Sequence, residues 1–278
     1  MTDAHQTAVA DFRRLHREGC FVLPNPWDVG TAIYLQHLGF KALATTSAGF
    51  AFSRGQPDGA VPRDEMLVHI GEVVAATPLP VNADFLNGFA DEPEEVGANV
   101  TRCLVTGVAG LSIEDSTGRA EQPLYEEALA IDRVGAARAA IDFSRSEVFL
   151  TARCEAFLVD HADPLPAVLA RLVAYAEAGA DCLYAPGLTE PGEIAQVVRA
   201  VAPKPVNVLV AGFNSHLSLA QLADLGVRRI SVGAGLALAA WSAFMRCARE
   251  IADSGNFHTL AEAARSAELN DLFSKRPK

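Results

Sequence analysis

Charged residues that could do chemistry together stand directly behind short apolar runs in this sequence. Asp84 and Glu114 each end such a run, and Arg153 ends another. Carboxylates that converge repel one another unless a cation lies between them. Mg²⁺ suits such a site, because it takes few carboxylates and keeps several waters. Arg153 could in addition clamp a small carboxylate with two parallel hydrogen bonds.

Small residues follow a further apolar run at Ser47, Ala48 and Gly49. Their size could let backbone N–H groups approach an anionic oxygen. Other polar positions have simpler interpretations. An aspartate between a strand and a helix is often a helix cap, and both Asp28 and Asp91 fit that role.

Two of the candidate groups also have structural alternatives. The pair Glu114 and Asp115 could form a surface turn, and Arg153 could be a salt-bridged structural residue. The seven histidines show no metal-ligand spacing, and the sequence has no H-E-x-x-H, G-x-S-x-G or P-loop motif. Zinc hydrolysis, serine hydrolysis and P-loop ATP chemistry therefore have no support.

The elements that would position these residues alternate along the chain. Apolar or β-prone runs typical of buried strands occupy 20–25, 38–46, 79–85, 106–115, 148–154, 178–186, 204–210 and 225–233. Segments with helical periodicity lie between and after them, at 29–38, 63–75, 94–106, 126–141, 164–178, 191–201, 217–225 and 234–252. Eight such repeats predict a parallel (β/α)₈ barrel, a TIM barrel, with its active site at the carboxyl ends of the strands. A doubly wound open sheet is the alternative, but no G-x-G-x-x-G follows the first run.

The chain of 278 residues is predicted to form a single domain over 1–278. An amphipathic helix within 1–19 precedes the barrel at 20–252, and a helical tail at 253–278 includes a helix over 258–268. A single barrel of this type commonly takes about 250 residues. Helices outside the eight repeats are therefore additions to the barrel.

Composition excludes several classes of function. The formal net charge of −11 argues against nucleic acid as a partner. The sequence has no 18-residue apolar run without charges and no signal-peptide pattern, so we expect no membrane partner. The five cysteines form no C-x-x-C pair, which is typical of small buried residues in a cytoplasmic protein.

Five segments in order give the sequence a family likeness. They are NPWDVGTA (25–32), TTSAGFAFSRGQPDG (45–59), ADFLNGFADEPEEV (83–96), GLSIEDS (110–116) and TARCEAF (151–157). Together they resemble the isocitrate lyase / phosphoenolpyruvate mutase superfamily, over about residues 10 to 250. The resemblance implies a barrel that binds Mg²⁺, or alternatively Mn²⁺, and a 2-oxo acid that reacts through an enolate. It also implies a homodimer or homotetramer in which subunits exchange a C-terminal helix.

The resemblance assigns roles residue by residue. Asp84 corresponds to a direct metal ligand and Glu114 to an acid that holds metal-bound water. Asp58 corresponds to a catalytic acid near metal and substrate and is included among the metal-site residues. Arg153 corresponds to the arginine that contacts the substrate in catalysis. The remaining substrate-binding positions are Ser47, Ala48, Gly49 and, by a weaker match, Asn207.

Two departures from the family pattern narrow the reaction. Leu86 stands where the family often has a second acid, so a metal contact is lost unless Asn87 or water replaces it. The segment STGRAEQPLYEE (116–127) has neither the Lys-Cys-Gly loop of the isocitrate-type lyases nor the Lys and Asn of the mutases. Arg119 and Glu121 are the charged residues that could serve there instead.

Three functions fit these observations. The first is a Mg²⁺-dependent lyase or decarboxylase acting on a small 2-oxo dicarboxylic acid such as an oxaloacetate-like compound. The second is a phosphonopyruvate-type mutase or hydrolase of a P–C bond, which needs an additional cation for the phosphonyl group. The third is a catalytically weak protein that binds a 2-oxo acid, a function that Leu86 favours.

Overall fold

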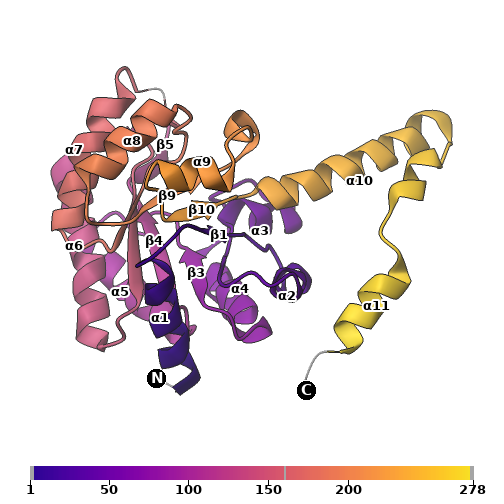
Figure 1. The fold of residues 1–278 in the computed structure, drawn as a ribbon, viewed down its shortest axis with the longest axis horizontal. Helices are drawn as coiled ribbons and strands as arrows, with labels where there is room; N and C mark the ends of the chain where they lie inside the picture. Colours follow the sequence, from indigo (N-terminus) through magenta and orange to yellow (C-terminus); the bar gives the residue numbers. More distant parts are fainter. Residues whose placement is uncertain (1–2, 160, 276–278) are drawn as a thin grey trace.

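Eight parallel strands form a nearly closed barrel in the computed structural model, which describes residues 3–159 and 161–275 (Figure 1). The strands are β1 (Phe21–Leu23), β2 (Leu43–Ala44), β3 (Val81–Asp84), β4 (Gly110–Glu114), β7 (Phe149–Arg153), β8 (Cys182–Tyr184), β9 (Val206–Leu209) and β10 (Arg229–Ser231). Their order is β1-β10-β9-β8-β7-β4-β3-β2. The predicted (β/α)₈ fold is therefore confirmed, and each predicted run contains one strand.

Hydrogen bonds from the ends of β1 and β2 close the barrel. The Ala44 N–H donates to the Pro24 carbonyl at 3.0 Å. The Asn25 side chain donates to the Thr45 carbonyl at 2.9 Å and accepts the N–H groups of Val232 and Gly233 at 3.0 and 2.9 Å. One buried amide thus ties together the carboxyl ends of β1, β2 and β10.

Helices cover the outside of the barrel. They are α2 (Val29–His37), α4 (Arg63–Ala76), α5 (Pro93–Val105), α6 (Glu127–Ser144), α7 (Pro164–Glu177), α8 (Pro191–Ala200) and α9 (Leu219–Asp224). Asp28 caps α2 as predicted, since its carboxylate accepts the Thr31 N–H at 2.7 Å. The prediction of Asp91 as a cap was wrong, because α5 begins after Glu92 and Asp91 binds Arg119 and Tyr125 instead.

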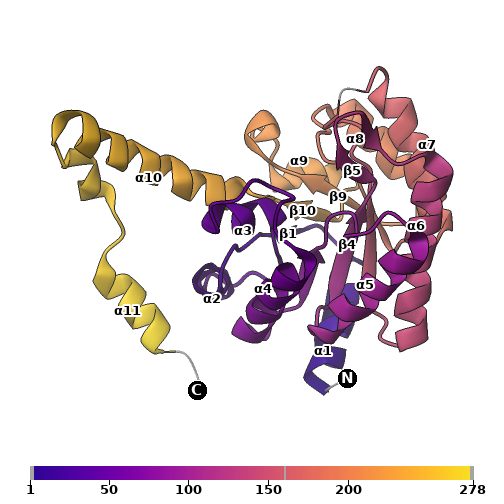
Figure 2. The same cartoon turned by 180° about the vertical axis from the view of Figure 1, so that it is seen from behind.

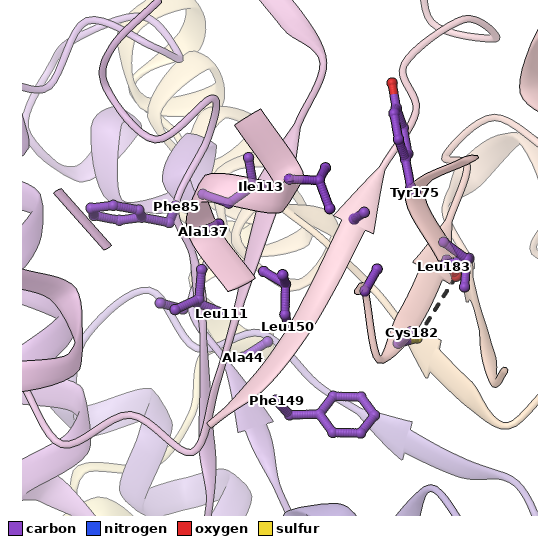
Figure 3. Packing of buried hydrophobic residues seen from close by; sticks show 14 of the residues in the cluster. Ala44, Phe85, Leu111, Ile113, Ala137, Phe149, Leu150, Tyr175, Cys182 and Leu183 are labelled. Carbon is purple, nitrogen blue, oxygen red and sulfur yellow. Dashed lines mark hydrogen bonds between the residues drawn. The ribbon is translucent and has the colours of Figure 1, made fainter. Parts of the chain in front are cut away.

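The hydrophobic core lies between the strands and these helices (Figure 3). Leu111, Leu150 and Leu183 come from three successive strands and are fully buried. Helix α1 (Asp3–Leu15) covers the amino-terminal ends of the strands, where Phe12 packs against Phe149. Burial on both faces explains why the strands appear in the sequence as continuous apolar runs.

Several elements differ from the prediction. The short helix α3 (Ser47–Ser53), the hairpin β5 (Ser116–Arg119) and β6 (Gln122–Leu124), and the turn η1 (Gly212–Asn214) were not predicted. The predicted helix over 258–268 was wrong, because η2 (His258–Glu262) and α11 (Ser266–Ser274) replace it. The carboxylate of Glu250 accepts the Thr259 N–H at 2.8 Å and the His258 N–H at 3.2 Å, which holds a tight turn there.

Helix α10 (Gly235–Ser254) leaves the barrel and projects away from it (Figures 1 and 2). Of its residues, Ala237 is the buried one. Large apolar side chains on α10 stay exposed, among them Leu238, Trp241, Phe244 and Met245. No helix of the described residues is long and apolar enough to cross a membrane.

Candidate active site

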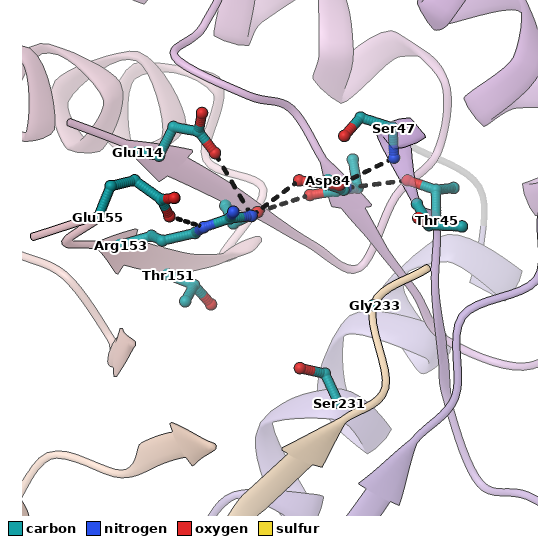
Figure 4. Close-up of polar contacts among 12 residues, drawn as sticks. Thr45, Ser47, Asp84, Glu114, Thr151, Arg153, Glu155, Ser231 and Gly233 are labelled. Atoms are coloured by element: carbon teal, nitrogen blue, oxygen red, sulfur yellow. Dashed lines mark hydrogen bonds and ion pairs between the residues drawn. The ribbon is translucent and has the colours of Figure 1, made fainter. Parts of the chain in front are cut away.

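Asp84, Glu114 and Arg153 meet at the carboxyl end of the barrel, because each is the last residue of its strand (Figure 4). The Nη1 atom of Arg153 lies 3.5 Å from Asp84 Oδ1 and 3.4 Å from Glu114 Oε2. Glu114 and Arg153 are opposite each other in the register of β4 and β7. The structure thus brings these three predicted site residues together.

Glu155 belongs to the same cluster but was not predicted as a site residue. Its carboxylate accepts a hydrogen bond from Arg153 Nε, and its side chain is 7% exposed. Figure 4 shows the Arg153 guanidinium between Asp84 and the two glutamates. A signal was present in the sequence, since residues two apart at a strand end point to the same face.

Charge is unbalanced in this cluster, where three carboxylates surround one guanidinium. Burial raises the pKa of Glu114 well above its usual value, Arg153 opposes that change, and the charges of Glu155 and Asp84 add to it. Burial likewise raises the pKa of Glu155. The neighbouring carboxylates hold the pKa of Arg153 well above its usual value against the effect of burial. A second cation would relieve the remaining repulsion.

Two carboxylate oxygens at this site, Asp84 Oδ1 and Glu114 Oε2, are buried without a hydrogen-bond partner among the described residues. Such oxygens are the donors that Mg²⁺ prefers, and the ion keeps several waters. The described part of the chain has no group of three or more His, Cys, Asp or Glu residues placed to hold a metal by themselves. The donors therefore fit a Mg²⁺ ion that is held by few carboxylates and largely by water.

Ser47 and Gly49 lie at the start of α3, where Thr46 caps the helix. The Ser47 N–H donates to Asp84 Oδ2 at 2.9 Å, and the Gly49 N–H donates to Thr46 Oγ1 at 3.2 Å. These two N–H groups are thus engaged within the protein. The predicted contact of Ser47, Ala48 and Gly49 with a substrate carboxylate stays a prediction.

Asp58 lies in the loop between α3 and α4, close to Ser47 and Asp84. The residue is exposed, and its carboxylate accepts the Gly59 N–H at 3.0 Å. Partial withdrawal from solvent and the charge of Asp84 raise the pKa of Asp58, while a hydrogen bond with the Ser47 side chain opposes that change. The structure places Asp58 at the rim of the acid cluster, and its catalytic role stays a prediction.

Asn207 lies within β9, in the interior of the barrel. Its side chain accepts from Arg229 Nε at 2.8 Å and donates to Ser231 Oγ at 3.0 Å. It lines a cavity of about 50 Å³ that Asp84 and Arg153 also line. Asn207 therefore borders the same cavity as the charged cluster, and its contact with a substrate stays a prediction.

Leu86, which stands where a second acid was expected, has an aliphatic side chain and takes part in the site's surroundings through its backbone. Leu86 has a positive φ of 48°, and its carbonyl accepts the Glu114 N–H at 3.0 Å. The neighbouring Asn87 turns its amide to the Tyr125 hydroxyl at 3.1 Å. Asn87 is thus engaged within the protein, and the replacement of the absent acid by water stays a prediction.

The two charged residues considered for the segment 116–127 lie on its exposed hairpin. Arg119 Nη1 binds Asp91 Oδ2 at 2.8 Å, in an ion pair about half exposed on both sides, and Glu121 is exposed. Neither residue is paired with the acid cluster.

Asp115 and Glu114 are adjacent in sequence but make different contacts. Its carboxylate accepts from the Tyr175 hydroxyl at 2.7 Å, from Arg171 Nη1 at 3.1 Å and from the Glu155 N–H at 2.8 Å. Asp115 is 3% exposed. It thereby anchors the segment that carries Glu155, while Glu114 faces the site.

Carboxylates and an arginine stand at the carboxyl ends of the strands of a parallel barrel, the end at which (β/α)₈-barrel enzymes carry their active sites. The chain belongs to the phosphoenolpyruvate phosphomutase family, whose sequence profile matches residues 12–252, within the isocitrate lyase / phosphoenolpyruvate mutase superfamily.

Known proteins of several organisms are similar to the chain. An uncharacterized protein of Mycobacterium tuberculosis is 36% identical over 247 residues, which cover 87% of this chain and 89% of that protein. The 2-methylisocitrate lyase of Escherichia coli is 31% identical over 179 residues, or 61% of this chain and 58% of the lyase. The crystal structure of a candidate lyase/mutase from Burkholderia cenocepacia superposes with a TM-score of 0.95 and 48% identity, and covers 98% of both chains.

Proposed function

We propose that the protein is a Mg²⁺-dependent lyase or decarboxylase that acts on a small 2-oxo dicarboxylic acid, such as an oxaloacetate-like compound, through an enolate. The observation that supports this most is a pair of buried oxygens, Asp84 Oδ1 and Glu114 Oε2, which accept no hydrogen bond among the described residues and contact Arg153 Nη1 only at 3.5 and 3.4 Å. The two oxygens could serve as ligands of a metal ion that needs further ligands. The Arg153 guanidinium beside them could bind a substrate carboxylate.

Each charged group then has a part in the reaction. Arg153 binds a substrate carboxylate, and Glu155 orients its guanidinium through Nε. When bound, Mg²⁺ acts as a Lewis acid that stabilises negative charge developing on the substrate. Asp84 and Glu114 would hold the ion, directly and through water. Asp58, at the rim, would transfer a proton to or from the substrate.

The comparison with a 2-methylisocitrate lyase supports lyase chemistry in general. The hairpin of β5 and β6 supplies neither a cysteine nor a lysine. Cleavage that needs a protonating thiol on this hairpin therefore has no residue there to carry it. Decarboxylation, or cleavage with proton transfer by water or Asp58, fits the residues present.

Phosphonopyruvate-type chemistry has less support, because Arg119 is paired with Asp91 and supplies no second cation. A catalytically weak binding protein is the second candidate. Leu86, which provides no carboxylate, and Asn87, whose amide binds the Tyr125 hydroxyl, favour it, since neither side chain would then hold the metal.

A turnover screen separates these functions. Purified protein is incubated with Mg²⁺ and a panel of 2-oxo mono- and dicarboxylic acids, with product formation followed by proton NMR and phosphonopyruvate followed by phosphorus NMR. We expect turnover of a 2-oxo dicarboxylic acid that is lost in Asp84→Asn and kept in the surface variant Asp91→Asn. Binding without product identifies the weak binding protein, and no binding of any compound contradicts the proposal.

We also propose that the protein is a homodimer or homotetramer in which α10 packs on a neighbouring subunit. Its exposed apolar face supports this, and a groove lined by Phe52, Leu238, Trp241 and Met245 lies between α3 and α10. In light scattering, Phe244→Glu is expected to shift the wild-type oligomer to monomer. Phe143→Glu, on α6, is the matched control, since Phe143 is 92% exposed. A wild-type monomer contradicts the proposal.

A further inference from the structure

A second cavity lies at the amino-terminal end of the barrel, the end opposite the acid cluster. Its volume is about 570 Å³, within the range of about 300–1,000 Å³ typical of small-molecule sites. It lies between α1, the first residue of β7, α8 and the segments that lead into β9 and β10. Its lining residues are Arg13, His16, Arg17, Phe149, Val198, Ala202, Pro203, Lys204, Pro205, Gly226 and Arg228.

The lining of this cavity is strongly basic. Arg13, Arg17, Lys204 and Arg228 contribute four cationic side chains, and none of the described residues that line it is acidic. The chain as a whole has 34 acidic and 23 basic residues. Four cations gathered from three separate segments of an acidic protein repel one another unless an anion lies between them.

Contacts within the protein leave much of this charge available. Arg228 Nη1 donates to the Gly19 carbonyl at 3.1 Å, and Arg13 Nε donates to the Glu147 carbonyl at 2.7 Å. Both acceptors are neutral. Arg13 also faces the carboxylate of Asp181 through two long contacts, from Nη1 to Oδ1 and from Nη2 to Oδ2, each at 3.4 Å.

That carboxylate is also shared, because Arg138 Nη1 binds it at 3.1 Å. Neither Arg17 nor Lys204 has an ion pair within the described part of the chain, so the pocket keeps a net positive charge.

The floor of the pocket is flat and neutral. The rings of His16 and Phe149 are stacked with their centres 4.0 Å apart. Burial and the nearby charge of Arg229 lower the pKa of His16 to about 3, so its imidazole is uncharged at neutral pH. An anion bound here would thus meet cations at the walls and an apolar surface beneath.

We propose that this pocket is a second binding site, for a small multivalent anion that carries phosphate or carboxylate groups. Strand β7 separates it from the active site, since Phe149 begins the strand at the pocket and Arg153 ends it at the acid cluster. Four residue steps of about 3.3 Å place the two ends about 13 Å apart. The planar guanidinium groups of Arg13, Arg17 and Arg228 suit such oxyanions, which they bind through paired N–H donors.

Calorimetric titration tests the site with two probes, pyrophosphate and citrate, in metal-free chloride buffer. The test variant is Arg17→Gln/Lys204→Gln, which removes the two cations without ion pairs. The matched control is Arg14→Gln/Arg102→Gln, which removes two exposed charges from α1 and α5 that do not line the pocket. Thermal unfolding of both variants checks that they are folded.

We expect wild-type protein to bind at least one probe, the test variant to bind it at least tenfold more weakly, and the control to stay within twofold. Preference for pyrophosphate identifies a phosphate ligand, and preference for citrate a carboxylate ligand. Failure of wild-type protein to bind either probe at millimolar concentration overturns the proposal. So does binding that the test variant retains, because the anion would then lie elsewhere, at Arg153 for example.

Discussion

Replacing Arg153 with glutamine is expected to destabilise the protein in a way that depends on pH. Arg153 is 19% exposed, and the glutamates that it faces are 11% and 7% exposed. Removal of one partner from a buried ion pair typically costs about 3–5 kcal/mol, because the opposite charge is left uncompensated. Arg153 is the one cation paired with these three carboxylates among the described residues, so we expect a loss of about 3 kcal/mol or more at pH 7.5.

Lowering the pH should reduce this loss. Burial already raises the pKa of Glu114 and Glu155 in the wild-type protein, and loss of Arg153 raises both further. A carboxyl group whose pKa is raised on folding binds more protons in the native state, so its folded form gains stability as pH falls through the raised pKa. At pH 5.5 the variant should therefore lie closer to wild type.

Urea unfolding of wild type and Arg153→Gln at pH 7.5 and pH 5.5 measures both effects. Arg119→Gln is the control, because its ion pair with Asp91 is about half exposed and such pairs contribute about 1 kcal/mol at most. The reasoning is refuted if Arg153→Gln is as stable as wild type at pH 7.5, or if its deficit is the same at both pH values.

Three further substitutions test separate parts of the structure. Leu86→Asp should restore the absent acid and tighten Mg²⁺ binding by about 10-fold or more in calorimetry; unchanged affinity would show that this position does not face the ion. Gly49→Ala should cost about 1–3 kcal/mol in urea unfolding, because the added Cβ would lie 2.6 Å from Thr46 Cγ2; a neutral change would contradict the tight packing. The pKa of His16 in the folded protein is lowered to about 3. As pH falls below 6.5, the imidazole is therefore protonated in the unfolded state but not in the folded state, and the free energy of unfolding decreases. Between pH 7.5 and 5 this amounts to about 2 kcal/mol, which His16→Gln should remove; an unchanged pH slope would exclude His16 as its source.

Much of the fold could be predicted because parallel strands are buried on both faces. Their apolar runs and the helical segments between them gave the order of all eight strands. The helix α3 and the hairpin of β5 and β6 were not recognised, because they are short and mix polar, small and aromatic residues. The helix predicted over 258–268 was wrong because the turn there depends on hydrogen bonds from the backbone to the Glu250 side chain. Sequence periodicity does not reveal such a contact.

The site could be predicted only in part for similar physical reasons. Asp84, Glu114 and Arg153 end their strands, so the fold brings them together directly. The role of Glu155 depends on the backbone after β7, which Asp115 fixes from the neighbouring strand. The engagement of the Ser47 N–H by Asp84 depends on where α3 begins, which the sequence did not reveal.

Calorimetric titration of Mg²⁺ in the presence of oxalate, a planar dicarboxylate that resembles the enolate of a 2-oxo acid, tests the central claim most directly. We expect one ion to bind per chain in wild-type protein, binding to be lost in Asp84→Asn, and binding to be kept in Asp91→Asn. Absence of binding in wild-type protein, or equal binding in Asp84→Asn, would contradict a metal-dependent site at the carboxyl end of this barrel.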